Sequence, residues 1–320
     1  MADNRDAGYA AAPATGVSKH MRLLRWILLA QLTLGTAALA QQGAMPPLPP
    51  ITDPPTGEHL PGKFVWADLF SSDVEASRKF YQQVFGWEWR LIKEPPQPYG
   101  VFYLDELPVA GLAYREAPDG GESYGRWIHY ISVEDVGASE LAIGERGGRT
   151  MLGRRTHADR GDYAILADAH DAPFGIMRSS SGDPGDYRAE HGEWIWRELF
   201  ARDLGAAIRF YTGLFAYEVE KDYENPEIVE YMLKSHGHLR AGIGSLSPDS
   251  DTAPTWLGYV RVDDIDAAVQ RTVAHGGEVI LEPRAEISDG GLAIVADPTG
   301  ATIGLLYWDY GEAAQKEMQR

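Results

Sequence analysis

The sequence predicts an α+β protein with four βαβββ modules arranged in two tandem repeats. The first observation behind this prediction is a signature that occurs twice. Trp-x-(Asp/Glu)-Leu-Phe-x-x-Asp begins at Trp66 and again at Trp196, 130 positions later. The second observation is a strand-and-helix pattern that begins at Trp127 and returns at Trp256. Because so many landmarks keep their register, we interpret the chain as a tandem duplication.

Each repeat shows the same order of elements. The first strand is expected at 63–70 and at 193–200. The helix that follows begins after Asp73 or Asp203, and aspartate is a preferred N-cap residue. The second helix follows Asp135 or Asp264 and stops at a Gly-Gly pair, which suits a left-handed C-terminal cap. Further strands are expected at 99–104, 109–114, 163–167 and 174–178, and in the second repeat at 228–234, 240–245, 292–296 and 302–308.

Shifts in composition divide the chain into six segments. The expected boundaries are an N-terminal extension with a secretory signal (1–40), a proline-rich extended linker (41–61), a first domain (62–178), a second linker (179–192), a second domain (193–309) and a polar tail (310–320).

The N-terminal segment has the pattern of a secretory signal. A basic start at 21–25 precedes an apolar run at 26–40, which ends with Ala38-Leu39-Ala40. This order is typical of a cleavable signal, and the run is shorter than the roughly 20 residues that a spanning helix needs. We therefore expect an exported protein, periplasmic or secreted. An uncleaved N-terminal anchor is the alternative.

The charge and cysteine content restrict the possible partners. The chain has 47 acidic against 29 basic residues, a formal net charge of −18, and no cysteine. Such a surface repels nucleic acid and anionic lipid, so we expect a small-molecule ligand, no nucleic acid, and no membrane contact beyond the signal segment. The absence of cysteine excludes disulfides and thiol chemistry. We expect a monomer with two pseudo-equivalent domains, or a homodimer.

Together these motifs resemble the vicinal oxygen chelate (VOC) superfamily of glyoxalases, bleomycin-resistance proteins and extradiol dioxygenases. The resemblance rests on the repeated tryptophan signature, on Phe85-Gly-Trp, and on Trp256-Leu-Gly-Tyr-Val-Arg-Val-Asp-Asp, His275-Gly-Gly and Ala296-Asp-Pro-Thr-Gly. It covers nearly all of residues 62–309. It implies two tandem glyoxalase-like domains, in which a pair of modules forms an incomplete mixed β-barrel with flanking helices around one cavity.

The resemblance also implies where a divalent metal would bind. Family members place ligands in the first strand of each module, seven residues before the helix-starting aspartate, and late in the last strand. Here the six positions hold Trp66, Ile128, Gly175, Trp196, Leu257 and Gly304. None supplies a donor that divalent metals use, so we expect no metal cofactor, although a metal is the family default. His129 is adjacent to one position, but strand alternation places it on the opposite face.

The same strand faces carry aromatic and polar side chains. The expected first cavity contains Trp66, Asp68, Ile128, Tyr130, Ser132 and Met177, and the second contains Trp196, Glu198, Leu257, Tyr259, Arg261 and Leu306. The candidate ligand-binding residues are Trp66, Asp68, Tyr130, Met177, Trp196, Glu198, Tyr259 and Arg261. Aromatic walls with a few fixed polar groups are typical of sites for small organic molecules. The alternative is a packed core in which Glu198 and Arg261 form an internal ion pair.

Three functions remain open at this point. An exported protein that binds a small aromatic or amphipathic molecule in a metal-free cavity is the first. A VOC-type lyase, isomerase or dioxygenase is the second, with Asp68 or Glu198 as the candidate catalytic base. In that case a tyrosine or Arg261 would stabilise an enolate. A non-catalytic structural pair of domains is the third.

Overall fold

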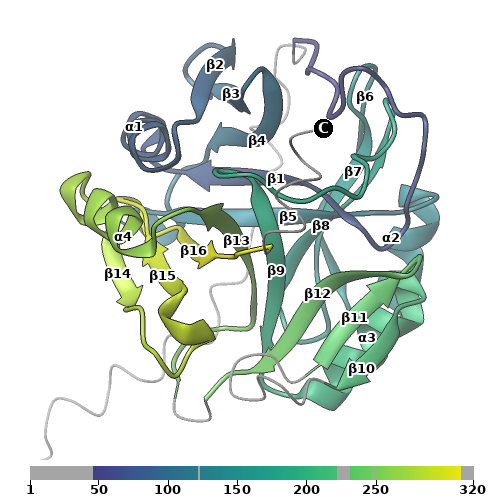
Figure 1. Ribbon diagram of the computed structural model, residues 1–320. Helices are drawn as coiled ribbons and strands as arrows, with labels where there is room; N and C mark the ends of the chain where they lie inside the picture. Colours follow the sequence, from purple (N-terminus) through teal and green to yellow (C-terminus); the bar gives the residue numbers. More distant parts are fainter. Residues whose placement is uncertain (1–45, 122, 222–230, 248–249, 311–320) are drawn as a thin grey trace, which may run out of the picture. The chain divides into compact units, whose positions relative to one another are not determined.

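The computed structural model describes residues 46–121, 123–221, 231–247 and 250–310, which form two eight-stranded mixed sheets (Figure 1). The expected signal segment and the tail beyond residue 310 lie outside these ranges. The first sheet has the order β2-β3-β4-β1-β5-β8-β7-β6, and the second repeats it as β10-β11-β12-β9-β13-β16-β15-β14. Neither sheet closes on itself, and the two tandem α+β domains confirm the predicted fold class.

The strand bounds follow the duplication. The first sheet contains β1 (Phe64–Ser71), β2 (Glu88–Lys93), β3 (Tyr99–Leu104), β4 (Leu107–Tyr114), β5 (Gly125–Ser132), β6 (Arg149–His157), β7 (Gly161–Ala167) and β8 (Pro173–Ser179). The second contains β9 (Trp194–Ala201), β10 (Glu218–Lys221), β11 (Tyr231–Ser235), β12 (His238–Ser245), β13 (Thr255–Val262), β14 (Glu278–Leu281), β15 (Leu292–Ala296) and β16 (Thr302–Tyr307).

The two modules of each sheet meet at its centre. In the first sheet β1 pairs parallel with β4 of its own module and antiparallel with β5 of the next, and β9 does the same with β12 and β13. The central pairing puts Trp66 opposite Tyr130 and Trp196 opposite Tyr259. Because side chains two residues apart share a face, these pairs fix which residues line each cavity face.

The four helices begin where the sequence predicts, and the second helix of each repeat ends at its Gly-Gly pair. They are α1 (Val74–Phe85), α2 (Val136–Glu145), α3 (Leu204–Phe215) and α4 (Ile265–Ala274). Asp73, Asp135, Asp203 and Asp264 each accept a hydrogen bond from a backbone N–H of the first turn. At the end of α2, Gly147 has a φ of 88° and the N–H of Gly148 donates to the carbonyl of Ile143, as a left-handed cap requires.

Four strands had no individual counterpart in the sequence pattern. β2, β6, β10 and β14 each follow a helix, and they contain many charged or half-exposed residues. β6 and β14 lie at one edge of their sheets, and β2 and β10 lie at the other. An edge strand buries little of its surface, so its alternation of apolar and polar residues is weak. The remaining expected strands lie within a few residues of those observed.

The two repeats share their apolar cores. In one core Ile131 and Phe174 of the first repeat pack with Phe210 and Trp256 of the second. In the other, Leu69 and Phe80 pack with Val260 and Ile303. Helix α1 accordingly contacts α4, and α2 contacts α3 (Figure 1). The partner repeat therefore covers the helical face of each sheet, and the opposite face is left for the cavity. Among the described residues no helix is long and apolar enough to cross a membrane.

Candidate functional site

The cavity face of the first sheet centres on Asp68. Its carboxylate oxygen Oδ1 accepts hydrogen bonds from the Trp66 indole at 2.9 Å and from the Tyr99 hydroxyl at 3.2 Å. Tyr130 and Met177 belong to the same buried cluster, so the structure brings the four predicted residues of this cavity together. Burial raises the pKa of Tyr130 well above its ordinary value, and the nearby Asp68 charge adds to the effect.

The first cavity is almost completely filled. Arg160 is only 2% exposed, and its guanidinium carbon lies 4.0 Å from the centre of the Trp66 ring. Its Nε donates to the carbonyl of Pro49 at 2.7 Å. Leu48 and Ile51 are each 4% exposed and pack in the same cluster. The remaining cavity has a volume of about 30 Å³, far below the roughly 300–1,000 Å³ of sites for drug-sized ligands.

This filling was not foreseen. The described part of the segment expected as an extended linker, 46–61, forms no helix or strand, and it packs on the first domain. We call residues 46–52 the strap. Tyr99, Arg160 and Leu48 were also missed as cavity residues. Tyr99 begins an expected strand, but the sequence does not show which face of the sheet it occupies or which residue it pairs with, because the partner strand is not known. Arg160 and Leu48 reach the cavity from segments that are distant in the sequence.

The cavity face of the second sheet centres on Glu198. This side chain is 1% exposed, and the Tyr259 hydroxyl donates to Oε2 at 2.9 Å. The other oxygen, Oε1, is buried and has no hydrogen-bond partner among the described residues. Burial raises the pKa of Glu198 to about 8, and the Tyr259 hydrogen bond offsets only part of that effect. The carboxyl group is therefore largely protonated and neutral at pH 7.

The surroundings of Glu198 are apolar and partly accessible. Leu257, Tyr259, Leu292 and Leu306 form the buried floor, and half-buried side chains pack against it: Ile195, Trp196, Phe200, Leu281, Ile287 and Ile294. A protonated carboxyl group has one O–H donor and keeps acceptor capacity. The arrangement can therefore donate a hydrogen bond to an acceptor on a largely apolar molecule, or exchange a proton with it.

Ser132 and Arg261, at equivalent positions in the two repeats, point to other partners. The Ser132 hydroxyl bonds Asp183 of the second linker. Arg261 pairs with Asp263 at 3.3 Å, and its Nε donates to the carbonyl of Trp308 at 3.2 Å. The Glu198–Arg261 ion pair considered from the sequence is therefore not formed. Both residues lie near the ends of their strands, where the neighbouring segments supply closer partners than the cavity does.

The positions at which the family binds metal have a steric feature of their own. A Cβ atom on Gly304 would lie 2.1 Å from a ring carbon of Tyr259, and one on Gly175 would meet Tyr130 at the same distance. A glutamate at either position therefore requires the tyrosine ring to move. No group of three or more His, Cys, Asp or Glu side chains is placed to hold a metal within the described ranges. His129 lies on the opposite face, as predicted, and accepts a hydrogen bond from Arg197.

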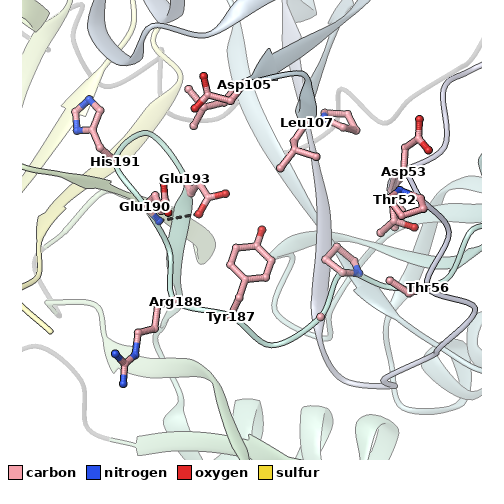
Figure 2. Close-up of a pocket in the computed structure, with 16 residues that line it drawn as sticks. Thr52, Asp53, Thr56, Asp105, Leu107, Tyr187, Arg188, Glu190, His191 and Glu193 are labelled. Atoms are coloured by element: carbon pink, nitrogen blue, oxygen red, sulfur yellow. Dashed lines mark hydrogen bonds between the residues drawn. The ribbon is translucent and has the colours of Figure 1, made fainter. Parts of the chain in front are cut away.

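A wider cavity of about 870 Å³ lies outside both cavity faces. Figure 2 shows Tyr187 projecting into this space, with Asp105 and Leu107 of the β3–β4 turn across from it. Asp53 and Thr56, which follow the strap, and Glu193 also line it. Because its walls are loops and linkers, its composition gave no strand or helix pattern by which the sequence could have predicted it.

Comparisons with known proteins agree with this architecture. The model of the Glyoxalase/Bleomycin resistance protein/Dioxygenase superfamily matches residues 63–177 and again 195–305. CFP32 of Mycobacterium tuberculosis, a protein provisionally named a glyoxylase, is 30% identical over 79% of this chain and 97% of its own length. The anthracycline biosynthesis protein DnrV of Streptomyces peucetius is 28% identical over 77% of this chain and 93% of its own.

Solved structures show the same fold at lower identity. The 2,3-dioxygenase LapB of Pseudomonas sp. KL28 has a TM-score of 0.54 and 13% identity, covering 79% of this chain and 94% of LapB. Homoprotocatechuate 2,3-dioxygenase of Arthrobacter globiformis has a TM-score of 0.53 and 17% identity, covering 83% of each chain. At this identity the likeness concerns the fold alone. With two matched repeats, two open eight-stranded sheets and relatives that span both, the chain belongs to the Glyoxalase/Bleomycin resistance protein/Dioxygenase (VOC) superfamily.

Proposed function

We propose that this protein binds a small aromatic or amphipathic molecule on the cavity face of its second domain, without a metal ion. The observation that carries the proposal is Glu198, a buried carboxyl group with one hydrogen bond and one oxygen that has no partner among the described residues. A buried polar group without a partner is costly, and a ligand that supplies an acceptor removes that cost. Asp68, its counterpart, already has two donors and a filled cavity.

The chemistry of the cavity indicates the ligand class. A neutral carboxyl group suits a carbonyl or phenol oxygen, and the half-buried Trp196 and Phe200 suit a flat apolar ring. Two relatives are named for anthracycline biosynthesis, and anthracyclines combine fused aromatic rings with such oxygens. We take an anthracycline as the probe for this reason.

The metal-free part of the proposal rests on the donor set. The six family positions hold no donor side chain, and tyrosine rings fill the space beside Gly175 and Gly304. Among the described residues each cavity face offers a single carboxyl group, which is too few for a divalent site. Native mass spectrometry before and after chelation tests this point. Stoichiometric metal retained by the purified protein contradicts it.

The binding proposal is tested with two substitutions at one position. Glu198→Leu removes the polar group at similar volume, whereas Glu198→Gln keeps a donor and an acceptor. In an anthracycline fluorescence titration we expect Glu198→Leu to raise Kd by about tenfold or more, the equivalent of one lost hydrogen bond, and Glu198→Gln to change it little. Asp68→Asn, in the filled cavity, is the matched control and should bind as the wild type does. Equal affinity of Glu198→Leu and wild type contradicts the proposal.

A VOC-type enzyme is the second candidate, and the same residue favours it. A carboxyl group with a pKa of about 8 is close to the value at which a general acid or base works at neutral pH. Glu198→Gln separates the two functions, because the amide preserves hydrogen bonding but cannot transfer a proton. Loss of turnover by about 10²-fold or more with unchanged binding supports the enzyme. Unchanged turnover of a converted compound excludes Glu198 as the acid or base.

We also propose that the protein is exported, on the strength of the basic start and apolar run at 21–40. N-terminal sequencing of the protein from its native host tests this. A mature chain that begins at Gln41 is expected. A chain that retains residues 21–40 in the cytosolic fraction contradicts it.

A further inference from the structure

Arg197 is a buried cation whose partners are all uncharged. The side chain is 6% exposed, its Nε donates to Nδ1 of His129 at 3.0 Å, and its Nη1 donates to the carbonyl of Trp196 at 2.9 Å. The guanidinium carbon lies 4.3 Å from the centre of the Trp194 ring. Within the described residues Arg197 forms no ion pair with a carboxylate, and no hydrogen bond from its Nη2 group is found.

This arrangement occurs only once in the duplicated fold. The equivalent of Arg197 in the first repeat is Ala67, and the equivalent of His129 in the second is Gly258. The small residues leave room for the large ones, since a Cβ atom on Gly258 would lie 2.4 Å from a ring carbon of His129. Burying a guanidinium without a counter-charge destabilises the folded state. The fold itself does not require that cost, because the equivalent strand pair in the first sheet forms without the arginine.

Arg197 lines a cavity of about 240 Å³ beneath the second linker. Lys63 and Arg240 also line it, but both pair with Asp186. Glu193, the other acid in the lining, accepts a hydrogen bond from the backbone N–H of Glu190 at 2.7 Å. Three cations face two anions, so the lining carries one positive charge in excess. Of the three cations, Arg197 is the one that forms no ion pair in the described part of the chain.

We propose that this cavity is a binding site for a small organic monocarboxylate, with Arg197 as the counter-charge. The net charge of the lining matches a monoanion rather than a phosphate dianion. Its volume is below the roughly 300–1,000 Å³ of sites for drug-sized ligands, which restricts the occupant to a small acid. Trp194, Trp196 and Leu239 provide apolar surface for the rest of the ligand.

The protonation of the two central groups agrees with this role. Burial lowers the pKa of Arg197 to about 9, so the guanidinium keeps its charge at neutral pH. Burial, reinforced by the Arg197 charge, lowers the pKa of His129 well below its ordinary value. A neutral His129 accepts the hydrogen bond from Nε and fixes the orientation of the guanidinium. The site shares Trp196 with the apolar surroundings of Glu198, but Arg197 itself lies on the opposite face of β9 from Glu198, because adjacent side chains of a strand alternate.

The test compares anions with a neutral analogue at constant ionic strength. Acetate and benzoate are the probes, and benzamide is the uncharged control. Because a ligand that binds the folded state stabilises it, benzoate or acetate should raise the Tm of the wild type while benzamide does not. Arg197→Met should lose the rise. Arg202→Met, which removes an exposed arginine, should keep it.

A second measurement needs no variant at Arg197. In the wild type the ¹⁵N resonance of the Arg197 guanidinium should shift on titration with benzoate or acetate and stay in place with benzamide. The proposal is overturned if neither anion raises the Tm, if benzamide acts as benzoate does, or if Arg197→Met responds like the wild type. Should Arg197→Met not fold, the guanidinium resonance alone decides, and its failure to move overturns the proposal.

Discussion

Asp68 and Glu198 occupy equivalent positions but have opposite environments. Asp68 accepts from an indole and a hydroxyl, and Arg160 lies within the same small cavity. Glu198 has one neutral donor and apolar neighbours, so it retains its proton. In the first domain Tyr99 donates to Asp68 and Arg160 lies over Trp66, and within the described residues the second domain shows no counterpart hydrogen bond or ring contact at Glu198.

The raised pKa of Glu198 predicts a pH dependence of stability. A carboxyl group with an ordinary pKa of 4.5 and a folded-state pKa of about 8 binds its proton more tightly in the folded state. Its stabilisation is complete below pH 4.5 and is lost as the pH rises toward 8. We expect the unfolding free energy of the wild type to fall over that window, relative to Glu198→Gln, by on the order of a few kcal/mol. Denaturant titrations across the window measure it.

The control for this experiment is Glu220→Gln, which removes an exposed carboxylate that pairs with Lys234. It should follow the wild-type profile closely, because an exposed ion pair contributes little. Parallel profiles for the wild type and Glu198→Gln would show that Glu198 is ionised in the folded protein at neutral pH.

Among the elements, the strap most changes the interpretation of the sequence. Proline content predicted an extended linker at 41–61, and its described part forms no helix or strand, yet Leu48 and Ile51 are buried on the cavity face of the first sheet. The sequence did not predict this packing, because composition describes the local preference of a segment and says nothing of an apolar surface that folds nearby. The helices were predictable for the converse reason. Their capping aspartates and Gly-Gly ends act on backbone groups within one turn.

Weakening the strap should open the first cavity. In Leu48→Ala/Ile51→Ala two buried anchors are shortened, and we expect cleavage between residues 46 and 60 by a broad-specificity protease to accelerate by tenfold or more, about 1.4 kcal/mol of lost anchoring. Limited proteolysis with mass spectrometry measures the rate. Leu107→Ala, which shortens a leucine that is 49% exposed, should leave it unchanged. An unaltered rate in the double variant would mean that other contacts hold the strap.

Over the whole molecule, the two repeats do not have separate cores. Phe174 of the first repeat packs against Phe210 of the second with ring centroids 6.4 Å apart, and the indole of Trp87 donates to the carbonyl of Gly192 at 2.8 Å. A single repeat would expose the helical face that its partner now covers. We therefore expect the described residues to unfold as one cooperative unit.

Phe210→Ala tests this cooperativity. Truncation of a phenylalanine in a shared core should cost about 3–5 kcal/mol. Hydrogen exchange should then accelerate in β5 and β8 of the first repeat as well as in the second repeat. Val273→Ala, at a residue of α4 that is 58% exposed, is the control and should leave both unchanged. Faster exchange confined to the second repeat would show that the two repeats unfold independently.

The sequence by itself determined the duplication, the order of elements, the helix ends and the faces of the central strands. These depend on local backbone chemistry and on alternation, which neighbouring residues encode. Only the tertiary structure decided that the first cavity is filled, that Glu198 has a single hydrogen-bond partner among the described residues, and that Arg197 lines a cavity without forming an ion pair there. These depend on groups far apart in the chain, such as Leu48 with Trp66 and His129 with Arg197, whose proximity only the folded packing creates.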